Sequence, residues 1–318
     1  MESLDGANAA FGKSDLPDAA FARILVVGAG TMGAQIAMVC ALGGHDTAVT
    51  DLTDDALSRA ESQLRARLDR DVAKGRRTRD DVDAAFARLT FSTNLDAAAA
   101  TADLVIEAAV EKLDVKREVF ARLDKLAPPH AILTTNSSAI MSSQLADATG
   151  RPDRVANMHF FNPALVMRCV EVVRGPDTSD ATVDAVVAVT RHLGKEPVVL
   201  RKEIPGFVAN RILGAARDEA IFLLEQGVAS VDDIDAACRT ALGYPMGPFE
   251  LMDLTGIDIG YHAKLARYAT SNDPRDLPSR TVTGLVERGE LGRKTGKGFY
   301  AYDADGTRHP RTDLEERP

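Results

Sequence analysis

Short apolar runs alternate with longer amphipathic stretches over the first two thirds of this 318-residue chain. Each run is bounded by polar or turn residues, as buried β-strands are. The predicted strands cover residues 24–27, 47–50, 103–107, 131–135, 154–160, 168–173 and 197–200. Because helical patterns separate them, they predict a Rossmann-like domain at 22–205, an α/β fold with a mostly parallel, doubly wound sheet.

Two amphipathic helices are expected within this domain, at residues 55–90. Leu57, Leu64 and Leu68 form one helical stripe, and a Lys74-Gly75 turn leads to a capping-box start at Thr78. The pattern predicts a protruding helical hairpin. Its basic residues, Arg65 and Lys74 among them, could bind a phosphorylated part of a substrate such as coenzyme A, or could form an ordinary solvated face.

The strand pattern ends at Pro205-Gly206, and helical patterns follow. They predict an all-α C-terminal domain over residues 206–302, beginning with one long helix at 207–226. Its apolar segments, including 220–224, suggest a homodimer interface, with core packing as the alternative. Residues 1–21 and 303–318 are expected to be flexible tails.

A glycine-rich turn joins the first strand to a helical pattern, and an acidic residue ends the next strand. Gly28 permits the tight turn, Gly30 allows close approach of a pyrophosphate, and Gly33 allows close packing of the helix on the strand. Asp51 is suited to bind the adenosine ribose, and its charge favours NAD over NADP. The predicted dinucleotide contacts are Gly28, Ala29, Gly30, Thr31, Met32, Gly33 and Asp51.

Composition narrows the possible partners and location. The net charge of −9 argues against nucleic acid as a main partner. Three widely spaced cysteines indicate reduced thiols and a cytoplasmic protein. No apolar run approaches the length of a membrane span, so no membrane association is expected. No metal-ligand pattern is identified.

A histidine and a glutamate mark the candidate chemistry. His159 lies near the end of a predicted strand, and Glu171 lies within the next one. A buried carboxylate needs a partner, and an imidazole would satisfy it. The carboxylate would fix the histidine tautomer and leave the second ring nitrogen free to take a proton. The pair therefore predicts a general base at the carboxyl edge of the sheet.

These motifs together resemble the NAD-dependent (S)-3-hydroxyacyl-CoA dehydrogenases, particularly bacterial 3-hydroxybutyryl-CoA dehydrogenases. The resemblance covers roughly residues 22–302. Its further signatures are Ile106-Glu-Ala-Ala-Val-Glu-Lys, Thr135-Asn-Ser-Ser, His159-Phe-Phe-Asn-Pro, Pro205-Gly-Phe-Val-Ala-Asn-Arg, Gly243-Tyr-Pro-Met-Gly-Pro-Phe-Glu and Lys294-Thr-Gly-Lys-Gly-Phe-Tyr. Ser137 and Ala139 depart from the family's usual threonine and serine.

The resemblance implies roles for individual residues. His159 would be the catalytic base and Glu171 its partner, while Ser138 and Asn210 would hydrogen-bond the reacting oxygen of the substrate. Further residues would surround the nicotinamide and its ribose: Glu107, Lys112, Asn136, Asn162 and Lys294.

The implied reaction transfers a hydride between NAD and C3 of a short-chain 3-hydroxyacyl-CoA such as 3-hydroxybutyryl-CoA, in fatty acid metabolism. The substrate is expected to enter between the two domains. Three alternatives remain: a 3-hydroxyacyl group carried by acyl carrier protein, a free hydroxy acid, and a non-catalytic dinucleotide-binding protein.

Overall fold

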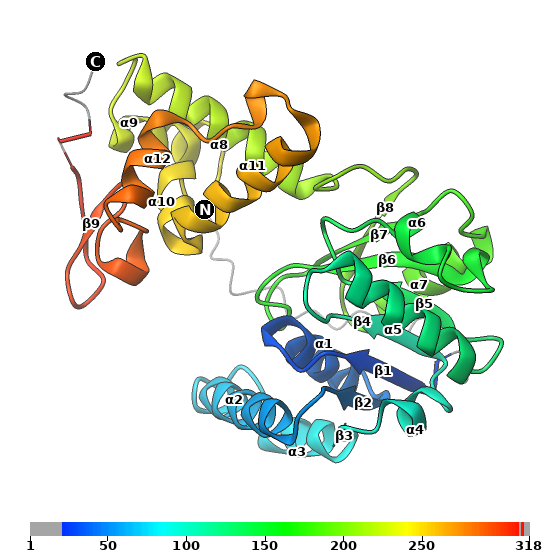
Figure 1. The fold of residues 1–318 in the computed structure, drawn as a ribbon. Coiled ribbons are helices and arrows are strands. Elements are labelled where there is room, and N and C mark those ends of the chain that lie inside the picture. Colours follow the sequence, from blue (N-terminus) through cyan, green and yellow to red (C-terminus); the bar gives the residue numbers. More distant parts are fainter. Residues whose placement is uncertain (1–20, 312, 315–318) are drawn as a thin grey trace. The chain divides into compact units, whose positions relative to one another are not determined.

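The chain folds into two compact units, one ending at Phe207 and the next beginning at Val208. The computed structural model describes residues 21–311, 313 and 314, coloured along the sequence in Figure 1. The division falls two residues after the expected boundary at 205. The predicted tail at 1–21 lies outside the described residues except for Phe21, which is buried.

The first unit is built on an eight-stranded sheet in the order β3-β2-β1-β4-β5-β6-β7-β8. Neighbouring strands run parallel except β6 and β7, which are antiparallel. The strands are β1 Arg23–Val27, β2 Asp46–Thr50, β3 Leu89–Ser92, β4 Leu104–Glu107, β5 Ile132–Thr135, β6 Val155–Phe160, β7 Cys169–Val173 and β8 Glu196–Leu200.

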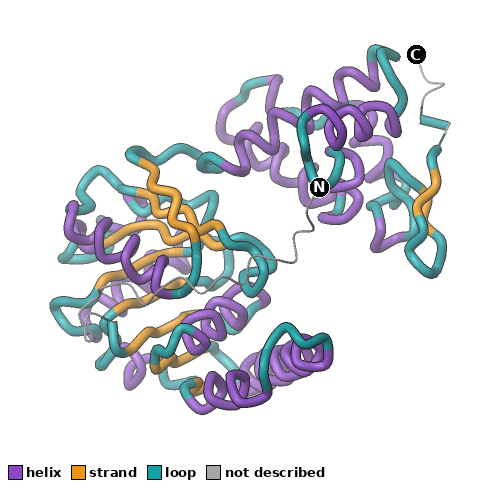
Figure 2. The backbone as a smooth tube through the Cα atoms, turned by 180° about the vertical axis from the view of Figure 1, so that it is seen from behind, coloured by secondary structure: helices purple, strands orange, loops and turns teal. Residues whose placement is uncertain are grey.

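Helices cover both faces of this sheet, as Figures 1 and 2 show. They are α1 Thr31–Leu42, α2 Asp54–Ala73, α3 Arg79–Ala87, α4 Leu95–Ala99, α5 Leu113–Leu126, α6 Ser143–Ala146 and α7 Asp180–His192, with a 3₁₀ turn at Pro152–Arg154. Ile24 and Val26 pack into one core and Leu25 into the other, because successive strand side chains point to opposite faces. Burial on both faces explains the continuous apolar runs in the sequence.

The helical hairpin forms as α2 and α3, with one addition. Thr53 and Thr78 cap the two helices through their hydroxyl oxygens, which accept hydrogen bonds from Ala56 N and Asp81 N. The segment directly after α3 is the edge strand β3, which the sequence prediction missed. Its alternating polar residues and its length of four residues give only a weak strand pattern.

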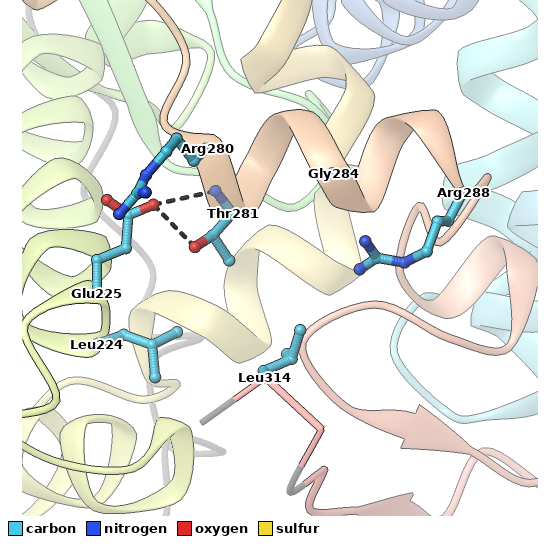
Figure 3. A pocket seen from close by; sticks show the side chains of 7 residues that line it. All are labelled: Leu224, Glu225, Arg280, Thr281, Gly284, Arg288 and Leu314. Atoms are coloured by element: carbon cyan, nitrogen blue, oxygen red, sulfur yellow. Dashed lines mark hydrogen bonds between the residues drawn. The ribbon is translucent and has the colours of Figure 1, made fainter. Parts of the chain in front are cut away.

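The second unit is mainly helical. Its helices are α8 Ala209–Glu225, α9 Val231–Ala241, α10 Pro248–Thr255, α11 Ile257–Ser271 and α12 Arg280–Glu287, with 3₁₀ turns at Pro274–Asp276 and Arg293–Thr295. Side chains from α8, α9, α10 and α12 form its core around Phe249 and Phe299. Beside α12 a pocket of about 220 Å³ lies between Glu225, Arg280 and Arg288, with Glu225 hydrogen-bonded to Thr281 (Figure 3).

The prediction of a flexible tail at 303–318 is wrong for residues 303–311, which are ordered. Strand β9, Ala301–Tyr302, pairs with β10, Arg308–His309, and Arg311 is only 5% exposed. The Arg311 guanidinium contacts Glu290 at 3.1 Å and Asp313 at 2.6 Å. These long-range contacts order a segment whose charged composition resembles a solvated end.

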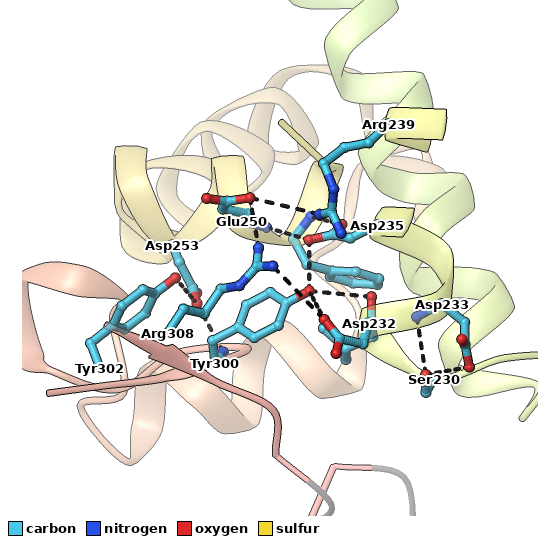
Figure 4. Close-up of polar contacts among 12 residues, drawn as sticks. Ser230, Asp232, Asp233, Asp235, Arg239, Glu250, Asp253, Tyr300, Tyr302 and Arg308 are labelled. Atoms are coloured by element: carbon cyan, nitrogen blue, oxygen red, sulfur yellow. Dashed lines mark hydrogen bonds and ion pairs between the residues drawn. The ribbon is translucent and has the colours of Figure 1, made fainter. Parts of the chain in front are cut away.

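Two buried carboxylates hold this hairpin to the helices (Figure 4). Asp253 accepts hydrogen bonds from Phe299 N, Tyr300 N and the Tyr302 hydroxyl, at 2.8, 2.9 and 3.0 Å. Asp235 accepts from the Tyr300 hydroxyl at 2.9 Å. Burial raises the pKa of Asp253 to about 6. The hydrogen bonds favour the charged form and oppose this shift, but burial is the larger effect.

Within the described residues, no helix has both the length and the apolar character needed to span a membrane. The three cysteines are all free thiols.

Candidate active site

The glycine loop between β1 and α1 has the geometry that the sequence predicted. Gly28 has φ +104°, and an added Cβ would lie 2.6 Å from the Ala108 carbonyl oxygen. A Cβ at Gly33 would lie 1.8 Å from the Gly28 carbonyl oxygen. At Gly30 a Cβ would meet nothing within 4 Å. The loop is therefore tightly packed on the protein side and open at Gly30.

This opening lies at the N-terminus of α1. Gly30 is the N-cap and offers no side-chain hydrogen bond, and the first turn contains no acidic residue. The N–H groups of the first turn lack partners within the helix, and the helix dipole favours an anion there. Thr31 and Met32 belong to this first turn. The loop fits a dinucleotide pyrophosphate.

Asp51 follows β2 directly and lies beside the glycine loop. Its Oδ2 accepts a hydrogen bond from Ala29 N at 2.7 Å, and its Oδ1 accepts one from Leu52 N, also at 2.7 Å. The carboxylate is thus held in place while remaining partly exposed. A fixed acceptor beside the loop suits the hydroxyls of the adenosine ribose.

His159 and Glu171 are directly opposite each other on the antiparallel strands β6 and β7. His159 Nδ1 donates to Glu171 Oε2 at 2.9 Å. His159 is 7% exposed and Glu171 is fully buried. In the described part of the chain, His159 Nε2 makes no hydrogen bond, so it is the nitrogen available to a ligand. Phe161 and Phe207 pack beside the imidazole, with ring centroids 4.6 and 5.5 Å away.

Ser138 lies in the loop that follows β5, which buried side chains hold rigidly. Asn157 donates to the carbonyl oxygens of Ser137 and Ile140 at 3.0 Å each and accepts from Ser142 N at 2.8 Å. The Ser138 carbonyl accepts from Gly206 N at 3.3 Å. The half-buried Ser138 hydroxyl forms no hydrogen bond with any described residue. The loop thus fixes its backbone and leaves its hydroxyl available.

Glu107 ends β4 and is fully buried in a polar cluster. Its Oε1 accepts from Lys116 Nζ and Ala109 N at 2.6 Å each, and its Oε2 accepts from the Thr135 hydroxyl at 2.7 Å. Lys112, which was predicted to lie near the nicotinamide, is the exposed N-cap of α5, and its contact with the cofactor stays a prediction. These three donors occupy the Glu107 carboxylate, so its contact with a cofactor stays a prediction.

The cluster includes two residues that the sequence analysis missed. Lys116 lies one turn after Lys112 and is 1% exposed. Its ammonium also lies 3.3 Å from Glu111, which accepts a short hydrogen bond from the Ser137 hydroxyl. A carboxylate at the end of an apolar strand requires a cation nearby, which was the available signal. Only the fold shows that Lys116 provides it.

Asn136 and Asn162 flank the end of β6. Asn136 is half-buried and accepts from Phe160 N at 2.9 Å, which links β5 to β6. Asn162 is exposed. The segment after it is held by Lys195, which donates to the Ala164 and Met167 carbonyl oxygens at 2.6 and 2.8 Å. Burial lowers the pKa of Lys195 to about 8.

The helical hairpin presents its basic residues on different faces. Arg65 is paired with Glu61 at 2.7 Å and lies over the Phe86 ring, 4.1 Å from its centroid. Arg67 and Arg70 instead line a pocket of about 330 Å³ between α1 and α2, which reaches Thr31. Lys74 is the exposed C-cap of α2. Arg70 was not predicted from the sequence, because only the packing of α1 on α2 forms this pocket.

Two predicted site residues belong to the second unit. Asn210 is exposed in the first turn of α8. Lys294 Nζ contacts the Asp258 carboxylate at 2.6 and 2.7 Å, and this ion pair lowers the pKa of Asp258. Their roles toward substrate and cofactor stay predictions.

Comparison with known families identifies the family of this chain. Residues 23–204 match the profile of the 3-hydroxyacyl-CoA dehydrogenase NAD binding domain, and residues 206–302 match that of the C-terminal domain. The chain is 41% identical over 291 residues to human mitochondrial hydroxyacyl-coenzyme A dehydrogenase, covering 88% of this chain and 91% of the relative.

Two bacterial relatives are similar. A 3-hydroxyadipyl-CoA dehydrogenase from Escherichia coli is 42% identical over 89% of this chain and 59% of its own length. The crystal structure of (S)-3-hydroxybutyryl-CoA dehydrogenase from Ralstonia eutropha has a TM-score of 0.82 at 39% identity, covering 89% of this chain and 99% of that one. The chain therefore belongs to the 3-hydroxyacyl-CoA dehydrogenase family and is an NAD-dependent oxidoreductase.

Proposed function

We propose that this enzyme transfers a hydride between C3 of an (S)-3-hydroxyacyl-CoA and NAD, with His159 as general base and Glu171 as its positioning residue. The observation that carries the proposal is the buried His159–Glu171 hydrogen bond of 2.9 Å, which leaves Nε2 without a partner among the described residues. Nδ1 carries the shared hydrogen, because a carboxylate can only accept. Nε2 is then the basic nitrogen.

The proton step follows from this arrangement. The substrate hydroxyl donates to His159 Nε2, and the imidazole takes its proton as C3 is oxidised. Glu171 stabilises the positive charge that develops on the ring. Ser138 and Asn210 would orient the reacting oxygen. Bound NAD supplies the acceptor for the C3 hydride.

Cofactor contacts are assigned to the residues around the glycine loop. The open position at Gly30 and the acceptor at Asp51 support binding of the pyrophosphate and the ribose. Asp51 also repels a 2′-phosphate, which supports the preference for NAD over NADP. Lys116 and Glu111 hold the loop that carries Ser137, so they act here as positioning residues.

We assign the phosphates of coenzyme A to the hairpin. Arg67, Arg70 and Lys74 supply cations on α2, two of them at the α1–α2 pocket. Arginine and lysine are suited to phosphate recognition. Arg65, which the sequence also assigned to the substrate, pairs with Glu61 and lies over Phe86, and Arg67 likewise pairs with Asp71 at 3.9 Å. The role of Arg65 stays a prediction.

The acyl group is assigned to the short-chain class. Relatives are named for 3-hydroxybutyryl-CoA and for 3-hydroxyadipyl-CoA, so chains of four to six carbons are the candidates. An acyl-carrier-protein substrate is the alternative. A cytoplasmic location and a role in fatty acid metabolism stay predictions.

We also propose a homodimer formed through the second unit. Helices α8 and α11 expose the apolar side chains of Ile212, Phe222 and Ile259, each more than half exposed. Burial of such side chains favours association. A molar mass of twice the chain by light scattering is expected, and a monomer at micromolar concentration would contradict it.

The decisive experiment follows NADH absorbance with acetoacetyl-CoA, free acetoacetate and the acyl-carrier-protein thioester as alternative substrates. We expect turnover with the CoA ester, reduced at least roughly a hundredfold in His159→Gln while NAD affinity is retained. Turnover confined to the carrier-protein thioester would replace the proposed substrate. An active His159→Gln variant would exclude His159 as the base.

A further inference from the structure

An arginine on α8 lacks the partners that a partly buried guanidinium normally has. Arg217 donates from Nη2 to the Thr255 hydroxyl at 3.2 Å. Its Nε is buried without a hydrogen-bond partner. No carboxylate of the described residues forms an ion pair with it, because the adjacent Asp218 is engaged by Lys264 at 2.7 Å. Burial lowers the pKa of Arg217, as expected for an undercompensated cation.

The position of Arg217 on α8 relates it to the proposed substrate residue Asn210. The two are seven residues apart, which places them on the same face of the helix. They are separated by about 10.5 Å along the axis at 1.5 Å per residue. Helical side chains generally lean toward the N-terminus, and the Arg217 side chain is much longer than that of Asn210, so we expect its guanidinium to lie on the Asn210 side of its Cα.

A second cation lies near the same end of α10. Thr255, which binds Arg217, precedes Gly256, and a Cβ at Gly256 would lie 3.2 Å from Lys294 Nζ. Lys294, however, is paired with Asp258. Of these two cations, Arg217 is the one left without an anion, and its Nη1 forms no hydrogen bond within the described chain.

We propose that Arg217 binds a carboxylate at the far end of the acyl chain, so that the preferred substrate is an ω-carboxylated 3-hydroxyacyl-CoA of about six carbons. This inference rests on the proposed function and specifies its substrate class. With C3 held at Asn210, the three carbon–carbon bonds from C3 to the terminal carboxyl group cover part of the distance along the helix face, and the long Arg217 side chain covers the rest. A carboxylate there would accept from Nη1 and supply the missing negative charge.

The test compares two six-carbon substrates that differ only at the terminus, 3-hydroxyadipyl-CoA and 3-hydroxyhexanoyl-CoA, with 3-hydroxybutyryl-CoA in parallel. We expect the wild-type enzyme to have the higher kcat/KM for the adipyl ester. Arg217→Gln should reduce that value roughly 10- to 100-fold, the range for a hydrogen bond to a charged group, and leave the hexanoyl value unchanged. Arg217→Lys should retain part of the preference.

Arg267→Gln is the matched control, since Arg267 is exposed on α11 and pairs with Asp276. It should preserve the preference. If the wild type oxidises 3-hydroxybutyryl-CoA but does not favour the adipyl ester, the inference fails and the proposed function stands. An equal loss for both six-carbon esters in Arg217→Gln would assign Arg217 a structural role and also overturn it. Inactivity toward every CoA ester would refute the proposed function as well.

Discussion

Replacing Glu171 with glutamine would test whether the negative charge of Glu171, rather than the size of its side chain, supports the function of His159. The substitution keeps the size of the side chain and an oxygen that can accept from Nδ1, but removes the negative charge. Because Glu171 is fully buried and 2.9 Å from His159 Nδ1, solvent screens this charge little. The charge matters most when the imidazole becomes protonated during oxidation.

The size of the effect follows from the distance. The charges of a carboxylate and an imidazolium are spread over several atoms, so their centres lie farther apart than the bonded atoms. Two unit charges about 4 Å apart interact by about 4 kcal/mol at an effective dielectric constant of about 20. The neutral hydrogen bond that glutamine retains offsets about 1 kcal/mol of this. The remaining loss of about 3 kcal/mol corresponds to a decrease in kcat of roughly a hundredfold.

Steady-state oxidation of 3-hydroxybutyryl-CoA, monitored by NADH absorbance, provides the assay. We expect a lower kcat with NAD affinity retained, since β7, which carries Glu171, lies four strands away from β1 and its glycine loop in the sheet. Glu118→Gln, at an exposed position of α5, is the matched control and should match wild type. A folded Glu171→Gln enzyme with kcat within threefold of wild type would refute the electrostatic role of Glu171.

Three further predictions concern the cofactor loop and the second unit. Gly33→Ala should lower both Tm and NAD affinity, because its Cβ would overlap the Gly28 carbonyl; Gly30→Ala, whose Cβ meets no protein atom, should weaken NAD binding with little change in Tm. Equal effects of the two substitutions on Tm would contradict the distinction between a packing role for Gly33 and a cofactor role for Gly30. Asp51→Ala should weaken NAD binding roughly tenfold or more and reduce the preference over NADP, measured by titration, because a charged hydrogen-bond acceptor is lost. An unchanged cofactor ratio would show that Asp51 does not face the ribose. The raised pKa of Asp253, about 6 against an ordinary 3.8, means that the folded state binds the proton more tightly than the unfolded chain. Its contribution to stability, about 3 kcal/mol at most, is therefore present below pH 4 and lost as pH rises through 6. Asp253→Asn should remove this component from the pH dependence of the free energy of unfolding of the second unit, and identical pH profiles would disprove it.

Much of this protein was determined by its sequence alone. Seven of the eight strands of the first unit, the glycine loop and the helix start at Thr78 each depend on residues close together in the chain. Apolar runs, glycines that accept unusual backbone angles and hydroxyls that cap helices act locally, so pattern and spacing identify them. The His159–Glu171 pairing was also predictable, because a buried charge requires a partner and the adjacent strand supplied one.

Tertiary structure decided the features that depend on distant contacts. Edge strand β3 exists because β2 offers an unpaired side, and Lys116 rather than Lys112 reaches Glu107 because α5 packs with that face inward. The β9–β10 hairpin is ordered by Arg311 and the contacts of Asp253, although its composition resembles a solvated tail. Likewise, only the folded structure shows that no carboxylate of the described residues pairs with Arg217, because the positions of the nearby carboxylates depend on tertiary packing. Such pairings depend on which surfaces the folded chain brings together, and local sequence patterns do not contain that information.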